Sequence, residues 1–189
     1  LKGERSMTKA LISIDYSYDF VADDGKLTAG KPAQAIEDRI AQVTQEAYDN
    51  GDYIFVAMDR HDEGDTFHPE TKLFPPHNIA GTSGRELYGK LAGVYDAIKD
   101  DNRVFWMDKR HYSAFSGTDL DIRLRERRVT TVVLTGVLTD ICVLHTAIDA
   151  YNLGYDIEVV ASATASLTPE AHDFAIGHFK NVLGATIVE

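Results

Sequence analysis

Cysteine is nearly absent from this chain, because Cys142 is the only one among 189 residues. A single cysteine cannot form an intramolecular disulfide, so nothing in the sequence points to an oxidising compartment. Long apolar runs are missing as well. The first apolar run, Ala10–Ile14, is too short for a signal peptide or a membrane span. We therefore expect a cytoplasmic protein that does not bind membranes.

Basic residues are scarce too. The chain has 19 Lys and Arg against 30 Asp and Glu, a formal net charge of -11. This balance argues against nucleic acid as a partner, because phosphate binding needs clustered positive charge. Hydrophobic residues make up 44% of the chain, too many for a disordered acidic protein. We expect residues 7–189 to form one domain, and Leu1–Ser6, ahead of Met7, to be a remnant of expression.

Short β-rich runs alternate with helical stretches. Ala10–Asp15 is an apolar run that ends in a charge, as in a strand buried on both faces. From Pro32 to Ala47, apolar residues recur every three or four positions, which is the period of one helix face. The other predicted strands are Tyr53–Met58, Val104–Met107, Thr131–Thr135, Ile157–Val160 and Thr186–Val188. The other predicted helices lie near Arg85–Leu91 and Asp119–Glu126 and over Asp140–Leu153 and Pro169–Leu183.

This alternation predicts an α/β fold: a doubly wound, mostly parallel six-stranded sheet with helices on both faces. Ligands bind such a sheet beyond the carboxyl ends of its strands. Asp15, Lys109 and the segment Gly136–Cys142 follow the first, third and fourth predicted strands. The second strand leads into a long loop, Asp59–Ser83, and loops of that length are usually functional or disordered. We expect the polar residues at these strand ends to converge on one site.

Cys142 falls in the first turn of a predicted helix, where free N–H groups and the helix dipole stabilise a thiolate. The same N–H groups can bind an oxyanion. A lone cysteine is more often a small buried hydrophobe, and Asp15 and Lys109 taken singly are more often ordinary charges. Together at adjacent strand ends the three residues indicate a nucleophile, with Asp15 as general base and Lys109 fixing the charges.

The long loop supplies a possible metal site. Asp59, His61 and His77 offer one carboxylate and two imidazoles, a set that suits Zn, Fe or Mn. His68 and Glu70 are further possible ligands in the same loop. The remaining histidines are interpreted as structural or surface residues: His111, His145, His172 and His178.

In order along the chain, these segments resemble the nicotinamidase branch of the isochorismatase-like cysteine hydrolases. The most specific match is Gly136-Val-Leu-Thr-Asp-Ile-Cys142-Val. The other matches are Asp15-Tyr-Ser-Tyr-Asp-Phe20, Asp59-Arg-His61, Phe74-Pro-Pro-His77, Gly81-Thr-Ser-Gly84 and Lys109-Arg-His-Tyr-Ser-Ala-Phe115. The chain departs from the family at Ser17, where Gln is common, at Phe74, where Trp is common, and near Ser162, where an Asp is missing.

The resemblance implies a catalytic triad of Asp15, Lys109 and Cys142. It implies a cis peptide between Val137 and Leu138, which directs the backbone N–H groups of Leu138 and Cys142 into an oxyanion hole. It also implies one divalent transition metal, zinc ahead of iron or manganese. The implied metal ligands are Asp59, His61 and His77, with Glu70 as a possible fourth, and the implied substrate-packing residues are Phe20, Phe74, Tyr112 and Leu138.

The implied activity is the hydrolysis of nicotinamide to nicotinate and ammonia in NAD salvage, through a thioester on Cys142, with pyrazinamide as a further substrate. Nicotinamide is then the expected partner, and we expect a homo-oligomer. Three alternatives stay open: an amidohydrolase of the same family that acts on a carbamoyl or ureido compound, a non-haem iron oxygenase, and a non-catalytic metal- or ligand-binding protein. Isochorismate-type vinyl-ether hydrolysis is disfavoured, because that branch lacks the cysteine.

Overall fold

The structure is a computed structural model that describes residues 7–189. The segment Leu1–Ser6, interpreted above as a remnant of expression, lies outside the described residues. None of the helices in residues 7–189 combines the length and the apolar character that a membrane span requires.

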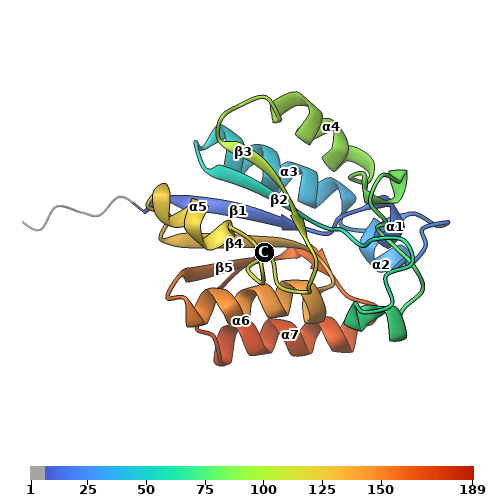
Figure 1. Cartoon of the computed structure of the whole chain (residues 1–189). Coiled ribbons are helices and arrows are strands. Elements are labelled where there is room, and N and C mark those ends of the chain that lie inside the picture. Colours follow the sequence, from blue (N-terminus) through green and yellow to red (C-terminus); the bar gives the residue numbers. More distant parts are fainter. Residues whose placement is uncertain (1–6) are drawn as a thin grey trace, which may run out of the picture.

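Six parallel strands form one sheet in the order β3-β2-β1-β4-β5-β6 (Figure 1). The strands are β1 (Lys9–Ile14), β2 (Tyr53–Asp59), β3 (Val104–Lys109), β4 (Thr131–Val137), β5 (Asp156–Ala165) and β6 (Thr186–Val188). The central strands β1 and β4 are buried along almost their whole length, as apolar strands covered on both faces should be. The predicted fold class is confirmed, and the sheet is parallel throughout.

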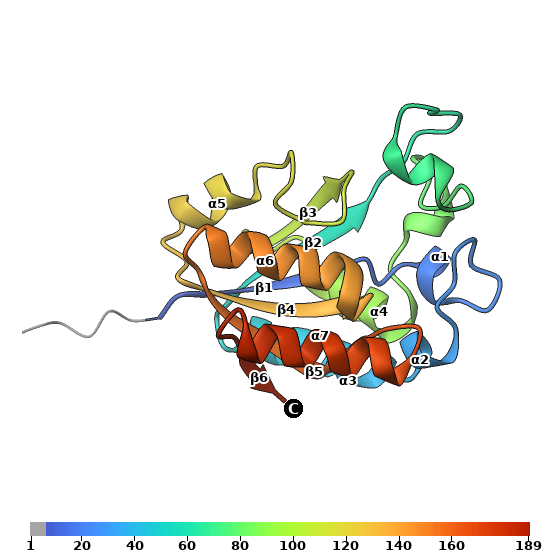
Figure 2. The ribbon, with the colours of Figure 1, turned by 90° about the horizontal axis from the view of Figure 1, so that it is seen from below.

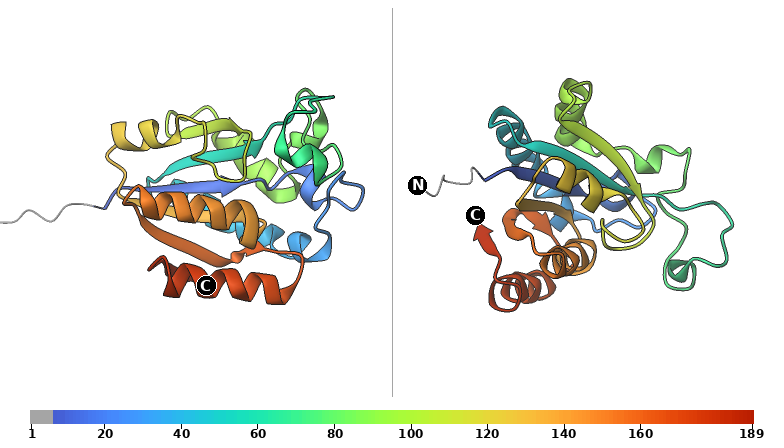
Figure 3. Two further views of the ribbon diagram at one scale, coloured as in Figure 1. Left: turned by 60° about the horizontal axis from the view of Figure 1, so that its bottom comes forward. Right: turned by 60° about the vertical axis from the view of Figure 1, so that its left-hand side comes forward.

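Helices cover both faces of this sheet (Figures 2 and 3). They are α1 (Tyr18–Val21), α2 (Lys31–Gln34), α3 (Glu37–Asp49), α4 (Gly89–Ile98), α5 (Leu120–Glu126), α6 (Leu144–Asn152) and α7 (Pro169–Asn181). Ile40 of α3 and Leu91 of α4 are buried in the core on one face. Ala147 of α6 and Phe179 of α7 are buried in the core on the other face. The sheet is therefore shielded from water on both sides, and its carboxyl edge is left for ligands.

Two predicted helices differ from the structure. The helix expected near Arg85–Leu91 is wrong: a 3₁₀ turn occupies Ser83–Arg85, and α4 begins only at Gly89. The residues between them are extended, because Leu87 forms a β-bridge with Ser17. The helix expected from Pro32 to Ala47 is divided into α2 and α3, because the chain leaves helical geometry before Glu37.

Candidate active site

The strand ends bring together the side chains that the sequence placed there. Asp15 follows β1 directly, Asp59 and Lys109 are the last residues of β2 and β3, and Cys142 follows β4. All four side chains are buried, and Asp15 and Lys109 have no exposed surface. Ligand atoms of Asp15, Asp59 and Cys142 lie within 4.8 Å of one another. Segments far apart in the sequence thus meet at one edge of the sheet.

Lys109 is the centre of this group. Its Nζ lies 2.8 Å from Asp15 Oδ2, 2.6 Å from Asp59 Oδ1 and 3.6 Å from Cys142 Sγ. Asp15 Oδ1 accepts the backbone N–H of Asp59 at 2.9 Å, which holds the two carboxyl groups in fixed relation. We call Asp15, Lys109 and Cys142 the thiol cluster. One cation here faces two carboxylates and a thiol. Asp15 and Cys142 were expected beside Lys109, whereas the contact with Asp59 was not.

Burial sets the protonation of the thiol cluster. It raises the pKa of Asp15 to about 6, with nearby Asp59 adding to the shift and Lys109 opposing it. Burial also raises the pKa of the Cys142 thiol well above its usual range, and the charge of Lys109 only partly offsets this. Burial disfavours the Lys109 charge, but Asp15 and Asp59 outweigh it and raise the pKa of Lys109. The resting thiol is therefore protonated, and the thiolate that we expected the helix start to stabilise requires a base.

The segment before α6 differs from the regular helix predicted over Asp140–Leu153. The peptide between Val137 and Leu138 is cis, as the resemblance implied. Thr139–Val143 then form a widened π-type turn, in which the Leu138 carbonyl accepts N–H groups from Ile141 at 3.1 Å and from Val143 at 3.2 Å. Cys142 thus lies in an irregular turn between β4 and α6 and not at the start of a regular helix.

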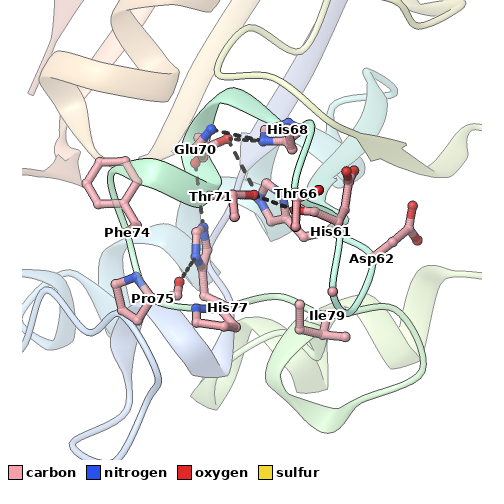
Figure 4. A pocket seen from close by; sticks show the side chains of 13 residues that line it. His61, Asp62, Thr66, His68, Glu70, Thr71, Phe74, Pro75, His77 and Ile79 are labelled. Carbon is pink, nitrogen blue, oxygen red and sulfur yellow. Dashed lines mark hydrogen bonds and ion pairs between the residues drawn. The ribbon is translucent and has the colours of Figure 1, made fainter.

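A second group of buried side chains lies beside the thiol cluster. His61 Nε2 is 3.8 Å from Glu70 Oε2, and His77 Nε2 is 3.6 Å from Glu70 Oε1 (Figure 4). His61 Nε2 also lies 3.7 Å from Asp59 Oδ2. Ligand atoms of all four residues lie within 4.8 Å of one another. We call Asp59, His61, Glu70 and His77 the histidine cluster. Asp59 joins the two clusters, because its other carboxylate oxygen contacts Lys109.

The histidine cluster has the properties of a metal site. Among the described residues, His61 Nε2, Glu70 Oε2 and His77 Nε2 are buried without a hydrogen-bond partner. His77 Nδ1 lies 2.7 Å from the carbonyl oxygen of Pro75 and must donate to it, so the Nε2 lone pair points into the cluster. Buried polar atoms without partners are costly. Two imidazoles and two carboxylates at these distances can hold a divalent transition metal.

His68 is not part of this set. Its Nδ1 accepts the backbone N–H of Glu70 at 3.2 Å, and its Nε2 lies 2.5 Å from the Arg110 carbonyl oxygen, to which it donates. Both ring nitrogens are therefore occupied. The residue that we considered as a further ligand instead holds Glu70 in place and ties the long loop to the end of β3.

Several contacts around Cys142 were missed by sequence reasoning. His172 of α7, interpreted as structural or surface, lies with its Nδ1 2.8 Å from Thr139 Oγ1. Thr146 donates to the Cys142 carbonyl at 2.7 Å. The only sequence signal for the Thr146 contact is its position one helical turn after Cys142. Nothing in the sequence indicates that α7 reaches Thr139.

One cavity, of about 170 Å³, connects the two clusters. It is bounded by Cys142 of the thiol cluster and by Asp59, Glu70 and His77 of the histidine cluster. All four residues expected to pack a substrate line it: Phe20, Phe74, Tyr112 and Leu138. Further lining residues, which were not predicted to contact a substrate, are Leu27, Thr28, Ala29, Ile141 and Leu167.

This arrangement has counterparts in known proteins. The family model described as the isochorismatase domain matches residues 9–188. The chain belongs to the isochorismatase family. Its relatives in that family include the uncharacterized isochorismatase family protein PncA of Bacillus subtilis, which is 55% identical over 97% of this chain and 100% of its own length.

Solved structures of family members are similar throughout. The pyrazinamidase/nicotinamidase from Streptococcus mutans UA159 is 81% identical, covers 96% of this chain and 100% of its own, and superposes with a TM-score of 0.95. The pyrazinamidase of Pyrococcus horikoshii, solved in complex with zinc, is 27% identical over 96% of this chain and 98% of its own, with a TM-score of 0.83.

The departures from the family pattern lie in different places. The Ser17 hydroxyl caps α1 by accepting the N–H of Phe20 at 3.3 Å and donates to Asn78 Oδ1 at 3.0 Å. Phe74 lines the cavity. Ser162 is exposed on β5, and its hydroxyl accepts from Arg39 Nε at 3.0 Å. Of the three, Phe74 is the one that can contact a ligand directly.

Proposed function

We propose that this isochorismatase-family chain is a nicotinamidase that also hydrolyses pyrazinamide. The observation that carries the proposal is the single cavity bounded by Cys142 on one side and by His77 and Glu70 on another. A planar aromatic amide in this cavity can present its carboxamide to the thiol and its ring nitrogen to the histidine cluster. The relatives named as nicotinamidases and pyrazinamidases support the same activity.

The thiol cluster would carry the chemistry. Asp15, with a pKa of about 6, accepts the proton of Cys142 as a general base. The sulfur attacks the carboxamide carbon, and the N–H groups of Leu138 and Cys142 bind the oxyanion. Asp15 returns the proton to the nitrogen as the C–N bond breaks and ammonia leaves. Water, deprotonated by Asp15, then hydrolyses the thioester, which releases nicotinate and regenerates the thiol.

Lys109 would stabilise the thiolate form of Cys142 during these proton transfers. Its ammonium group contacts Asp15 and lies 3.6 Å from Cys142 Sγ. In that position it favours the thiolate over the thiol when Asp15 takes the proton. Its third contact, with Asp59, keeps that carboxylate ionised. Burial raises the pKa of Asp59, but Lys109 and His61 outweigh burial and lower this pKa to about 2.

The histidine cluster would hold one divalent metal, and we propose zinc. Asp59, His61, Glu70 and His77 are the proposed ligands, because their ligand atoms converge and those of His61, Glu70 and His77 include buried atoms without a partner. The bound metal supplies a Lewis-acid contact for the pyridine nitrogen and so orients the substrate. Phe20, Phe74 and Tyr112 would pack the ring between the two clusters, which selects flat aromatic amides.

The test is ammonia release from a panel of amides by the purified protein. We expect nicotinamide and pyrazinamide to be hydrolysed well, and benzamide and carbamoyl or ureido compounds poorly. A higher kcat/KM for a carbamoyl or ureido compound would instead favour the alternative amidohydrolase. Ammonia release from none of these compounds would favour a binding protein.

Two further proposals concern the setting of the enzyme. We infer that the chain forms a homo-oligomer, which light scattering of the purified protein tests by mass. We also infer that it acts in the cytoplasm, in NAD salvage. Fractionation of the source cells, with nicotinamidase activity followed in each fraction, tests this.

A further inference from the structure

Asp19 is a buried carboxylate that the chemistry above does not use. It lies on α1 with 5% of its surface exposed, and it does not line the cavity. Within residues 7–189 it has no ion-pair partner. Its two oxygens accept backbone N–H groups instead, from Lys26 at 3.2 Å and from Asn78 at 2.8 Å. A buried carboxylate without a cation is unfavourable, so these two hydrogen bonds are what stabilise Asp19 in this position.

Asn78 connects Asp19 to the two histidines of the histidine cluster. It is fully buried with a left-handed backbone (φ 46°), and it directly follows His77. Its carbonyl oxygen accepts the N–H of His61 at 3.0 Å, and its side chain accepts from Ser17 at 3.0 Å. The two imidazoles of the histidine cluster are therefore connected through the backbone of one residue.

Gly84 encloses the same carboxylate from the other side. A methyl group on Gly84 would overlap all three atoms of the Asp19 carboxyl group. The neighbouring Arg85 donates through Nε to the Asp59 carbonyl oxygen at 2.7 Å. Asp19 is therefore fixed by close packing against Gly84 as well as by hydrogen bonds, and Arg85, the residue after Gly84, is tied to the start of the long loop.

We propose that Asp19 is a positioning residue for the metal site, acting through Asn78 on the spacing of His61 and His77. The inference rests on the proposed metal site but not on the proposed substrate. A carboxylate suits this role, because each of its oxygens accepts and neither donates, so both backbone N–H groups are satisfied at once. In an asparagine at position 19, an NH₂ group would replace one of the two carboxylate oxygens. That NH₂ group would face a backbone N–H, and two donors cannot form a hydrogen bond.

The test measures Co²⁺ affinity by titration of the visible spectrum, with Asp19→Asn as the variant and Asp24→Asn, an exposed residue of the same region, as the matched control. All proteins are studied at a temperature where circular dichroism shows them folded. We expect Asp19→Asn to bind Co²⁺ about tenfold more weakly than wild type, the lower end for residues that support metal ligands. Asp24→Asn should bind like wild type. Saturating metal should restore nicotinamide turnover in Asp19→Asn, since Asp19 touches neither substrate nor thiol.

A second variant covers the case in which Asp19→Asn does not fold. Gly84→Ala displaces the carboxylate without changing it, and Gly93→Ala is its control, because a methyl group on Gly93 meets no other atom within 4 Å. Gly84→Ala should weaken Co²⁺ binding and Gly93→Ala should not. Co²⁺ affinity within twofold of wild type in the folded variants would overturn the role of Asp19. A wild-type protein that binds no Co²⁺ would overturn the metal site itself, and with it this inference.

Discussion

The thiol cluster and the histidine cluster lie side by side and are joined by Asp59, yet they are built differently. In the thiol cluster the cation is a side chain, since Lys109 lies between Asp15 and Asp59. In the histidine cluster Lys109 pairs with Asp59 alone, and among the described residues His61 Nε2, Glu70 Oε2 and His77 Nε2 are buried without a hydrogen-bond partner. The first cluster carries its own counter-ion, and in the proposed function a bound metal would supply positive charge to the second. This difference separates the chemical step from the orientation of the substrate.

The largest effect is expected from the thiol itself. Cys142→Ala removes the attacking atom and should lower kcat for nicotinamide by at least about 10⁴-fold. Co²⁺ affinity should stay within twofold of wild type, because the histidine cluster keeps all its ligands. Cys142→Ser should also be nearly inactive, because an alcohol is far less acidic than a thiol in the same site. Near-normal turnover in either variant would contradict the nucleophile.

Loss of Lys109 should damage both clusters. Lys109→Ala leaves Asp15 and Asp59 buried without their cation, which should cost about 3 kcal/mol or more of the free energy of unfolding. Activity should be lost with it, and Asp15→Asn should be as inactive while it costs less stability. Lys90→Ala is the matched control, because the Lys90 side chain forms an exposed ion pair with Asp38 and its loss should leave the free energy of unfolding nearly unchanged. Urea titration and ammonia release measure the two effects.

The pH dependence of kcat/KM should report on the thiol cluster. Asp15 acts as a base only when ionised, and burial raises its pKa to about 6. Activity towards nicotinamide should therefore fall about tenfold per unit as the pH drops below about 6. Cys142 alkylation by iodoacetamide should fall in parallel. A flat profile between pH 4 and pH 7 would show that the thiol does not depend on Asp15.

Glu70 should have the smallest effect and should act on the histidine cluster alone. Glu70→Gln removes a charge from the cluster but keeps the size of the side chain, so Co²⁺ affinity should drop about tenfold. The rate of Cys142 alkylation should not change. Glu63→Gln, an exposed residue of the same loop, is the control. Unchanged Co²⁺ affinity in Glu70→Gln would remove Glu70 from the ligand set.

The strand ends explain how far sequence reasoning could go. Apolar runs that end in Asp15, Asp59 and Lys109 locate the site, because parallel strands bring their carboxyl ends to one edge. The π-type turn at Thr139–Val143 was predicted as a regular helix, because no local residue preference marks its widening. At Gly136 a methyl group would overlap the Ile14 carbonyl oxygen, a close approach that no local pattern reveals.

Other features depend on contacts between segments far apart in the chain. Leu27 and Leu167 face the cavity from two loops that meet only in the folded protein. Both ring nitrogens of His68 are hydrogen-bonded, which distinguishes it from the proposed metal ligands. Its sequence position near Glu70 does not make this distinction. The start of α4 was misplaced because Leu87 pairs with Ser17, 70 positions earlier, and this contact outweighs local helix propensity.

Removal of the metal tests the division of labour between the clusters most directly. The purified protein would be treated with a chelator, and three rates compared before and after: nicotinamide hydrolysis, benzamide hydrolysis and alkylation of Cys142 by iodoacetamide. We predict that kcat/KM for nicotinamide falls at least about 100-fold, because the contact to the ring nitrogen is lost. Benzamide, which has no ring nitrogen, should be a poor substrate in both states, and alkylation should change by less than about threefold. Unchanged nicotinamide hydrolysis after full removal of the metal would contradict the division, and so would a parallel loss of thiol reactivity.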